Sequence, residues 1–136
     1  MSKTRLTEAV KTLDLVETKR ILEAKPELQA IWNDQGRNLL HLACGANCKK
    51  LGKPESAGAR LVTYLLDGGF NIEEQGGSGS DLCKPVWFAT AFGRNATVVK
   101  LLLKRGAQPT GLYAAGWWDD VHILKLLIDA GLIKGL

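Results

Sequence analysis

The sequence of 136 residues lacks any apolar run that approaches the length of about 18 residues needed for a membrane-spanning helix. Its first residues, Met1 to Arg5, lead into polar sequence and not into the apolar core of a secretory signal. These two absences predict a cytoplasmic protein that has no membrane partner.

Cysteine is scarce, and the pattern of the three that exist excludes most of its structural uses. Cys44, Cys48 and Cys83 are an odd number in a chain without an export signal, so we expect free thiols and no disulfide framework. The spacing of Cys44 and Cys48 would place both sulfurs on one face of a helix. A zinc site needs two further ligands, for which only Cys83 and His41 are conceivable, so we expect no metal.

Groups for acid–base or nucleophilic catalysis are also few. Only two histidines exist, His41 and His122, whereas a hydrolase or transferase needs a nucleophile, a base and an orienting group. The glycine-rich segment 76–80 lacks the lysine and helix that follow a phosphate-binding loop, and we interpret it as a flexible hairpin tip. We expect no enzymatic activity and no cofactor. A pocket converging on His41, Cys44 and Cys48 would revive the enzymatic alternative.

The composition that is present is typical of one ordinary globular domain, with 46% hydrophobic and 24% charged residues. The formal net charge is +4, which permits attraction to nucleic acids, anionic membranes or acidic proteins but selects none of them.

An internal repeat runs through the chain. Three segments are apolar at the same positions and end in glycine: 61–69 (LVTYLLDGG), 98–106 (VVKLLLKRG) and 123–131 (ILKLLIDAG). Each predicts a short buried helix with a glycine at its end. A weaker copy, 18–26, ends at Pro26 instead.

A second alanine-containing apolar segment precedes each of these helices. The four segments are 6–10, 40–44, 86–90 and 111–115. Ala89 and Ala114 are 25 residues apart, which is also the distance between the two helical segments that follow them. Because small residues let neighbouring helices approach closely, the sequence predicts a stack of helix pairs.

At the segment 34–44 (DQGRNLLHLAC) the sequence resembles the ankyrin-repeat family, whose unit is a β-turn and two antiparallel helices with the signature T-P-L-H-x-A. Gly36, Leu40, His41 and Ala43 match the family's turn glycine, leucine, histidine and alanine. The resemblance implies that His41 is structural and bonds the backbone of the neighbouring turn. We expect the other histidine, which follows two aspartates, to face solvent or to cap a helix.

The resemblance covers nearly the whole chain. It implies an all-α, ankyrin-type solenoid of stacked antiparallel helix pairs with short β-turn or hairpin loops, in a single domain of residues 1–136. The repeats span roughly 4–32, 33–71, 72–107 and 108–136. Repeat two has a longer connection between its helices than repeat three, which predicts an insertion within 45–60.

The resemblance also implies a non-enzymatic module that binds a partner protein through a concave face, built by first-helix positions and hairpin tips. By register this face holds Phe88, Phe92, Tyr113 and Trp117, with Trp118 beside them. Aromatic residues are favoured anchors at protein interfaces. The alternative is that these rings pack together and seal the last repeat. Polar hairpin residues would flank the patch: Asn33, Asp34, Gln35, Arg37, Asp81 and Lys84.

The insertion is a second candidate contact, because Lys49, Lys50, Lys53 and Arg60 form a basic cluster that suits phosphate or an acidic partner, unless it is simply solvated. The sequence therefore predicts a monomeric protein-binding module, which by analogy could be a neutralising or regulatory partner of another protein. The alternative function is nucleic-acid or acidic-partner binding through Lys49–Lys53. Nucleic acid is the weaker candidate, since no aromatic residues interleave with the basic run.

Overall fold

The computed structural model describes residues 2–77, 83–110 and 112–131. In these ranges the backbone is mostly helical and forms no strand, apart from one isolated antiparallel bridge between Trp32 and Asn38, so the all-α class is confirmed. The helices are α1 (Ser2–Lys11), α2 (Leu15–Ala24), η1 (Pro26–Ala30), α3 (Leu39–Cys44), α4 (Cys48–Leu51), α5 (Glu55–Asp67), α6 (Pro85–Phe88), η2 (Ala89–Gly93), α7 (Ala96–Lys104), α8 (Leu112–Trp117) and α9 (Val121–Asp129). None of these described helices is long and apolar enough to cross a bilayer.

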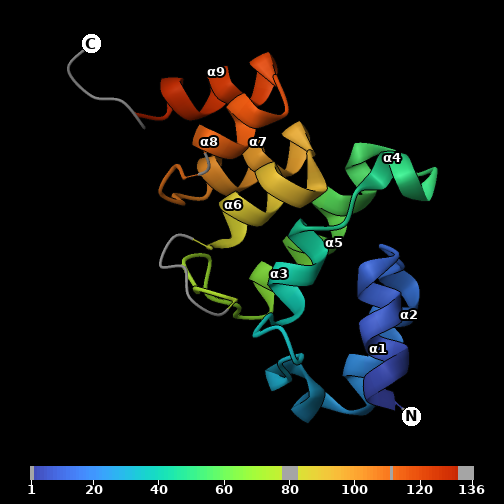
Figure 1. Ribbon diagram of the computed structural model, residues 1–136. Coiled ribbons are helices and arrows are strands. Elements are labelled where there is room, and N and C mark those ends of the chain that lie inside the picture. Colours follow the sequence, from blue (N-terminus) through green and yellow to red (C-terminus); the bar gives the residue numbers. More distant parts are fainter. Residues whose placement is uncertain (1, 78–82, 111, 132–136) are drawn as a thin grey trace.

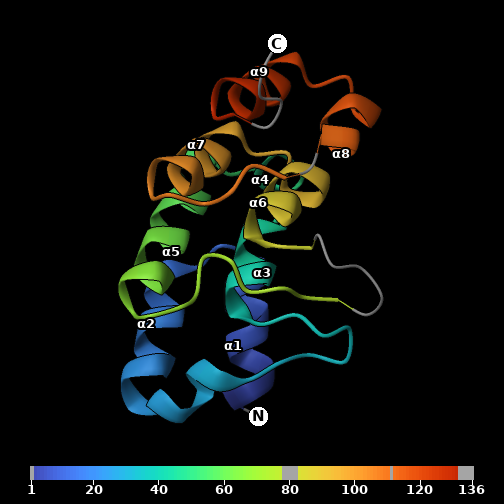
Figure 2. The ribbon, with the colours of Figure 1, turned by 90° about the vertical axis from the view of Figure 1, so that its left-hand side faces the viewer.

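The helices lie in two rows (Figures 1 and 2). The first row is α1, α3, α6 and α8, and the second row is α2, α5, α7 and α9. Helices pack in pairs across the rows: α1 with α2, α3 with α5, α6 and η2 with α7, and α8 with α9. The connection that follows α2 projects beyond the first row, as does the described part of the connection that follows α5 (Figure 2).

Three of the turns between the helices of a pair share one geometry. Each has a residue with positive φ, namely Leu13 (59°), Arg94 (48°) or Asp119 (55°). The next residue is an aspartate or asparagine whose side chain accepts a hydrogen bond from a backbone N–H in the first turn of the second helix. This cap satisfies one of the donors that a helix start leaves without a partner.

The second pair differs, because α4 stands in place of the short turn. Asn47 caps α4, and Gly52 ends it in the left-handed region with φ 68°. The side-chain ammonium of Lys53 then donates to the carbonyl of Thr12 at 2.5 Å. The segment 45–60 is thus folded and fastened to the first pair.

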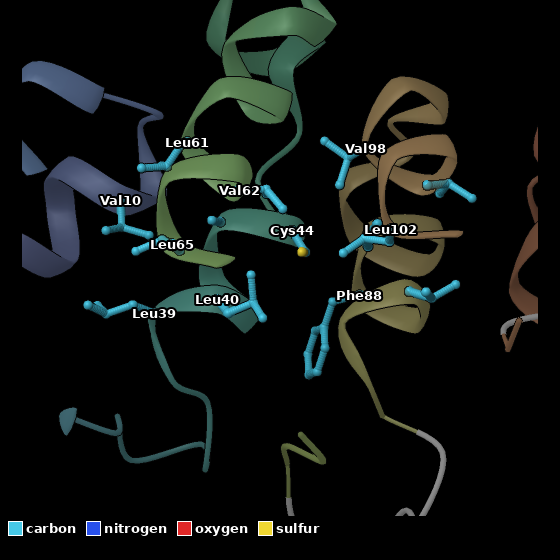
Figure 3. Packing of buried hydrophobic residues seen from close by; sticks show 14 of the residues in the cluster. Val10, Leu39, Leu40, Cys44, Leu61, Val62, Leu65, Phe88, Val98 and Leu102 are labelled. Carbon is cyan, nitrogen blue, oxygen red and sulfur yellow. The ribbon is translucent and has the colours of Figure 1, made fainter. Parts of the chain in front are cut away.

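Buried apolar side chains lie between successive pairs (Figure 3). From α5, Leu61 and Leu65 turn toward Val10 of α1, whereas Val62 turns the other way toward Leu102 of α7. All five of these side chains are at most 1% exposed. A fully buried side chain of this size contributes roughly 1.5–3 kcal/mol, so each pair relies on its neighbours for most of its stability.

Replacing Leu102 with alanine tests this shared core. The cavity should lower the free energy of unfolding by about 2–5 kcal/mol. Val16, which is 80% exposed on α2, offers a control, because its replacement by alanine should change stability by less than about 0.5 kcal/mol. Urea denaturation followed by circular dichroism measures both; equal losses would mean that Leu102 does not join two pairs.

Backbone contact between the second and third pairs predicts a second effect. A Cβ on Gly93 would lie 2.2 Å from the carbonyl oxygen of Cys44, whereas a Cβ on Gly116 of α8 would meet nothing within 4 Å. Gly93→Ala should therefore destabilise the protein by about 1–3 kcal/mol. Gly116→Ala should stabilise it by about 0.5–1 kcal/mol, because alanine is the better helix former. Thermal unfolding of the two variants should shift in opposite directions, and a shift in the same direction would contradict the packing.

Candidate binding surface

Five rings meet where the first-row helices α3 and α6 lie side by side, and we call them the aromatic cluster. Its members are Trp32, His41, Trp87, Phe88 and Phe92. The His41 and Phe88 centroids are 4.9 Å apart, and Phe92 lies 5.2 Å from Trp87 and 5.9 Å from Phe88. Centroid separations of 4.5–7 Å are those of favourable ring pairs.

His41 holds the cluster to the loops. Its Nδ1 accepts from the backbone N–H of Asn38 at 3.0 Å, so the other ring nitrogen carries the proton and Nε2 donates to the carbonyl of Glu74 at 2.7 Å. The Asn38 side chain accepts from the His41 N–H at 2.9 Å, which completes a reciprocal cap at the start of α3. The imidazole sits over Gly76, where a Cβ would come within 2.6 Å of the ring. His41 thus bonds the backbone of the next loop, as the ankyrin resemblance implied.

Arg37 covers the aromatic cluster from the first projecting loop. Its guanidinium carbon is 5.2 Å from the Phe88 centroid and 4.9 Å from the Phe92 centroid, within the range of cation–π contacts. The Nε of Arg37 is buried and has no hydrogen-bond partner among the described residues. A buried N–H without a hydrogen-bond partner carries a desolvation cost in the folded chain.

A groove of about 420 Å³, which we call the first-row groove, opens beside these rings. Phe88 and Phe92 line one side, and α4 supplies Lys50 and Leu51 to its wall. Its lining includes three basic residues, Lys11, Arg37 and Lys50, and no carboxylate from the described part of the chain. The groove therefore combines aromatic surface with positive charge.

The predicted patch is only partly exposed. Phe88 is 1% exposed, so its predicted place on the open face is wrong: its ring points toward α3, between two helix pairs (Figure 3). Phe92, four residues on, is 43% exposed and takes the open position at the groove. The register carried over from the family could not show this difference, because Phe88 is buried against the ring of His41, a contact between residues distant in the sequence.

The sequence allows two interpretations of the aromatic rings in the last pair: an exposed binding patch, or rings that pack and seal this pair. The two tryptophans differ in this respect. Trp118 donates from its indole N–H to the Ala91 carbonyl at 2.8 Å, and the Arg94 guanidinium lies 4.4 Å from its ring centroid, so Trp118 helps to seal α8 against η2. Trp117 is 82% exposed on the same helix. The side chain of Tyr113 lies outside the described residues.

The polar loop residues also serve different purposes. Asn33 shapes its loop, since its side-chain oxygen accepts from the N–H groups of Gln35 and Arg37. Asp34 and Gln35 are exposed at the loop tip. Lys84 is half-buried, and its Nζ lies 3.8 Å from the Oε1 of Glu73. Asp81 falls outside the described residues.

Sequence reasoning missed two contributions to this surface. Trp32 is 42% exposed and packs edge-on against His41 at 5.6 Å, yet no repeat register pointed to it. Lys50 was assigned to a separate basic cluster, but the structure brings it to the same groove as Phe92. Lys53, by contrast, is engaged with the Thr12 carbonyl and not available for a partner.

Among the described residues, the thiols and histidines are the candidates for metal binding and nucleophilic chemistry. In the described ranges no three His, Cys, Asp or Glu side chains are placed to hold a metal ion. Cys44, Cys48 and Cys83 are buried free thiols. Burial raises the pKa of Cys44 and of Cys48, so formation of the reactive thiolate is disfavoured at both residues. His122 is exposed near the start of α9, as expected.

Comparison with models of protein families and with curated proteins found no match to the chain.

The buried imidazole makes stability depend on pH. Desolvation by burial, together with the charge of Arg37, keeps the pKa of His41 below its ordinary value, although the hydrogen bond to Glu74 and the carboxylate of Glu74 oppose this. The unfolded chain then binds more protons than the folded one as the pH falls below the ordinary value of about 6.5, so stability is complete above this pH and declines below it, by at most about 1.4 kcal/mol per pH unit.

We expect His41→Gln to flatten this decline between pH 7.5 and 5.5, because the glutamine amide takes up no proton in that range. His122→Asn should keep the decline of the parent. Urea denaturation at several pH values measures the slope, and an unchanged slope in His41→Gln would show that another group is responsible.

Proposed function

We propose that this protein is an ankyrin-type solenoid that acts as a non-enzymatic binding module for a partner protein, in the cytoplasm and as a monomer. Two rows of paired helices, loops that project beyond the first row, and a first-helix histidine bonded to the next loop all support this assignment. Helix pairs that share their apolar faces with neighbours are typical of repeat proteins.

The proposed binding surface is the first-row groove with the aromatic rings at its edge. Its strongest support is the placement of Phe92, an exposed ring that faces Arg37 and lines a groove containing three cations. Interfaces favour aromatic and arginine anchors, and charge around them selects the partner. A fitting partner presents an apolar side chain for the groove and carboxylates for Lys11, Arg37 and Lys50.

This surface replaces the predicted division between an aromatic patch and a basic insertion. Lys50 belongs to the groove, and Lys53 belongs to the fold through Thr12. Bases stack on aromatic faces during single-strand binding, but of the two phenylalanines that line the first-row groove Phe88 is buried, so Phe92 alone offers an exposed ring. A protein partner therefore fits this groove better than nucleic acid does.

Replacing Phe92, which lines the groove, and Trp117, the exposed ring of the predicted patch, with alanine should abolish partner binding and leave the fold nearly intact, because these residues are 43% and 82% exposed. Affinity capture from cells of the natural source, with quantitative mass spectrometry, provides the measurement. A true partner is enriched by the parent and is at least tenfold reduced with Phe92→Ala/Trp117→Ala.

A matched control replaces two exposed apolar residues away from the groove, Val16 and Val121, with alanine. The control should retain the partner, and all three proteins should have the same circular dichroism spectrum. If the double aromatic variant keeps every protein that the parent enriches, the proposed surface is wrong.

A further inference from the structure

A second groove lies on the opposite side of the molecule from the first row, and the proposed function does not use it. Its volume is about 570 Å³, and α2, α5 and α7 all line it. We call it the second-row groove. These three helices lie side by side in the second row (Figure 2).

Helical periodicity shows which face of α5 forms this groove. Its core residues, such as Leu61 and Leu65, are buried against the other pairs. The groove is lined instead by a stripe that runs from Ser56 through Ala59 and Thr63 to Asp67. A stripe of this extent covers about 16 Å of helix, or three turns. Because these side chains are small, the middle helix leaves a furrow between its two neighbours.

The floor of the furrow is apolar. Leu15 of α2, Ala59 of α5 and Leu101 of α7 line it, together with the ring of Tyr64. The three aliphatic residues are only partly buried in the isolated chain. A ligand that covers them would remove further apolar surface from water.

Positive charge surrounds this floor. Lys19 comes from α2, Arg60 from α5, and Lys100 and Lys104 from α7, and all four are exposed. None of the four forms an ion pair with a carboxylate of the described residues. The whole chain has a formal net charge of only +4, so these four cations make the groove a strongly basic region.

Carboxylates near the groove include Asp67, which lines it, Glu55, and Glu23, which adds to the effect of burial in raising the pKa of the lining residue Tyr64. Asp67 accepts from the guanidinium of Arg105 at 2.9 Å. Glu55 accepts from both the backbone N–H and the hydroxyl of Thr97. The one carboxylate among the described lining residues, Asp67, is therefore paired with a cation outside the lining, and it forms no ion pair with the four basic side chains.

We propose that the second-row groove binds an acidic amphipathic helix of about three turns from a partner protein. An apolar stripe on such a helix would lie on Leu15, Ala59 and Leu101. Carboxylates on its two flanks would meet Lys19 on one wall and Lys100 and Lys104 on the other. A helix bound in an apolar groove contacts it through side chains three and four residues apart. The residues of α5 that line the furrow, from Ser56 to Asp67, have the same spacing.

Other anionic ligands match only part of this surface. A nucleic-acid backbone would satisfy the cations but leave the aliphatic floor uncovered, with Tyr64 as the single aromatic ring for stacking. An anionic bilayer is broad and cannot enter a furrow between three helices. Charge and shape together favour the acidic helix.

The test uses fluorescence anisotropy with a labelled peptide of 14 residues that carries leucines in one helical stripe and glutamates on both flanks. A peptide of scrambled order, a peptide with lysine for glutamate, and single-stranded oligothymidylate serve as comparison probes. The parent should bind the acidic amphipathic peptide at least tenfold more tightly than any of the other three. Equal or tighter binding of the scrambled peptide or the oligonucleotide would overturn the proposal, as would no binding of the acidic peptide.

Charge reversal then locates the site. Lys100→Glu/Lys104→Glu should weaken binding of the acidic peptide at least tenfold, whereas Lys3→Glu/Lys125→Glu makes the same charge change outside the groove and should weaken it less than twofold. Ala59→Gln should also weaken it, because a longer side chain fills the furrow without adding charge. Equal effects of the two charge reversals would overturn the proposal.

Phe92→Ala/Trp117→Ala should bind the acidic peptide as the parent does. This result separates the second-row groove from the first-row groove, so either proposal can fail alone. Loss of acidic-peptide binding in the aromatic variant would place the peptide in the first-row groove and overturn the second-row assignment.

Discussion

The structure depends on apolar surface that neighbouring helix pairs bury together. α5 shows this best, because Leu61 and Val62 are adjacent in sequence yet lie against different pairs (Figure 3). A single pair of helices, each about ten residues long, cannot cover both of its apolar sides. The stack therefore determines the order of the helices and leaves the outer faces and the loops free to vary.

His41 extends this constraint from the core to the surface. It is fully buried, caps α3 through Asn38, and donates to the Glu74 carbonyl of the next loop. One side chain thus fixes the start of a helix and the path of the following loop. It also provides the ring against which Phe88 packs. These contacts hold the His41 ring in one position, and a surface held in place before binding loses less conformational entropy when it binds.

Much of the fold could be predicted from sequence, because it follows from local patterns. Apolar spacing and terminal glycines located the second helices, and the length difference in repeat two located the segment that forms α4. The side chains at the surface were harder, because their exposure depends on contacts between distant residues. Phe88 and Phe92 are the same residue type four positions apart, but Phe88 packs against His41 and is buried, whereas Phe92 has no such contact with His41 and is 43% exposed. Trp117 and Trp118 are adjacent, and the contacts of Trp118 with the Ala91 carbonyl and the Arg94 guanidinium distinguish their roles.

The insertion shows how such a stack can acquire a binding surface without disturbing its core. Elsewhere a turn with a positive-φ residue and an Asx cap joins the two helices of a pair directly. In the second pair the chain first forms α4, yet α5 still packs on α3 as the other second helices pack on their partners. Lys53 and the buried Cys48 fasten the extra segment, and Lys50 and Leu51 are then held beside Phe92. The extra residues lie between the two helices of the second pair, and the first-row groove lies where they meet Phe88 and Phe92 of the third pair.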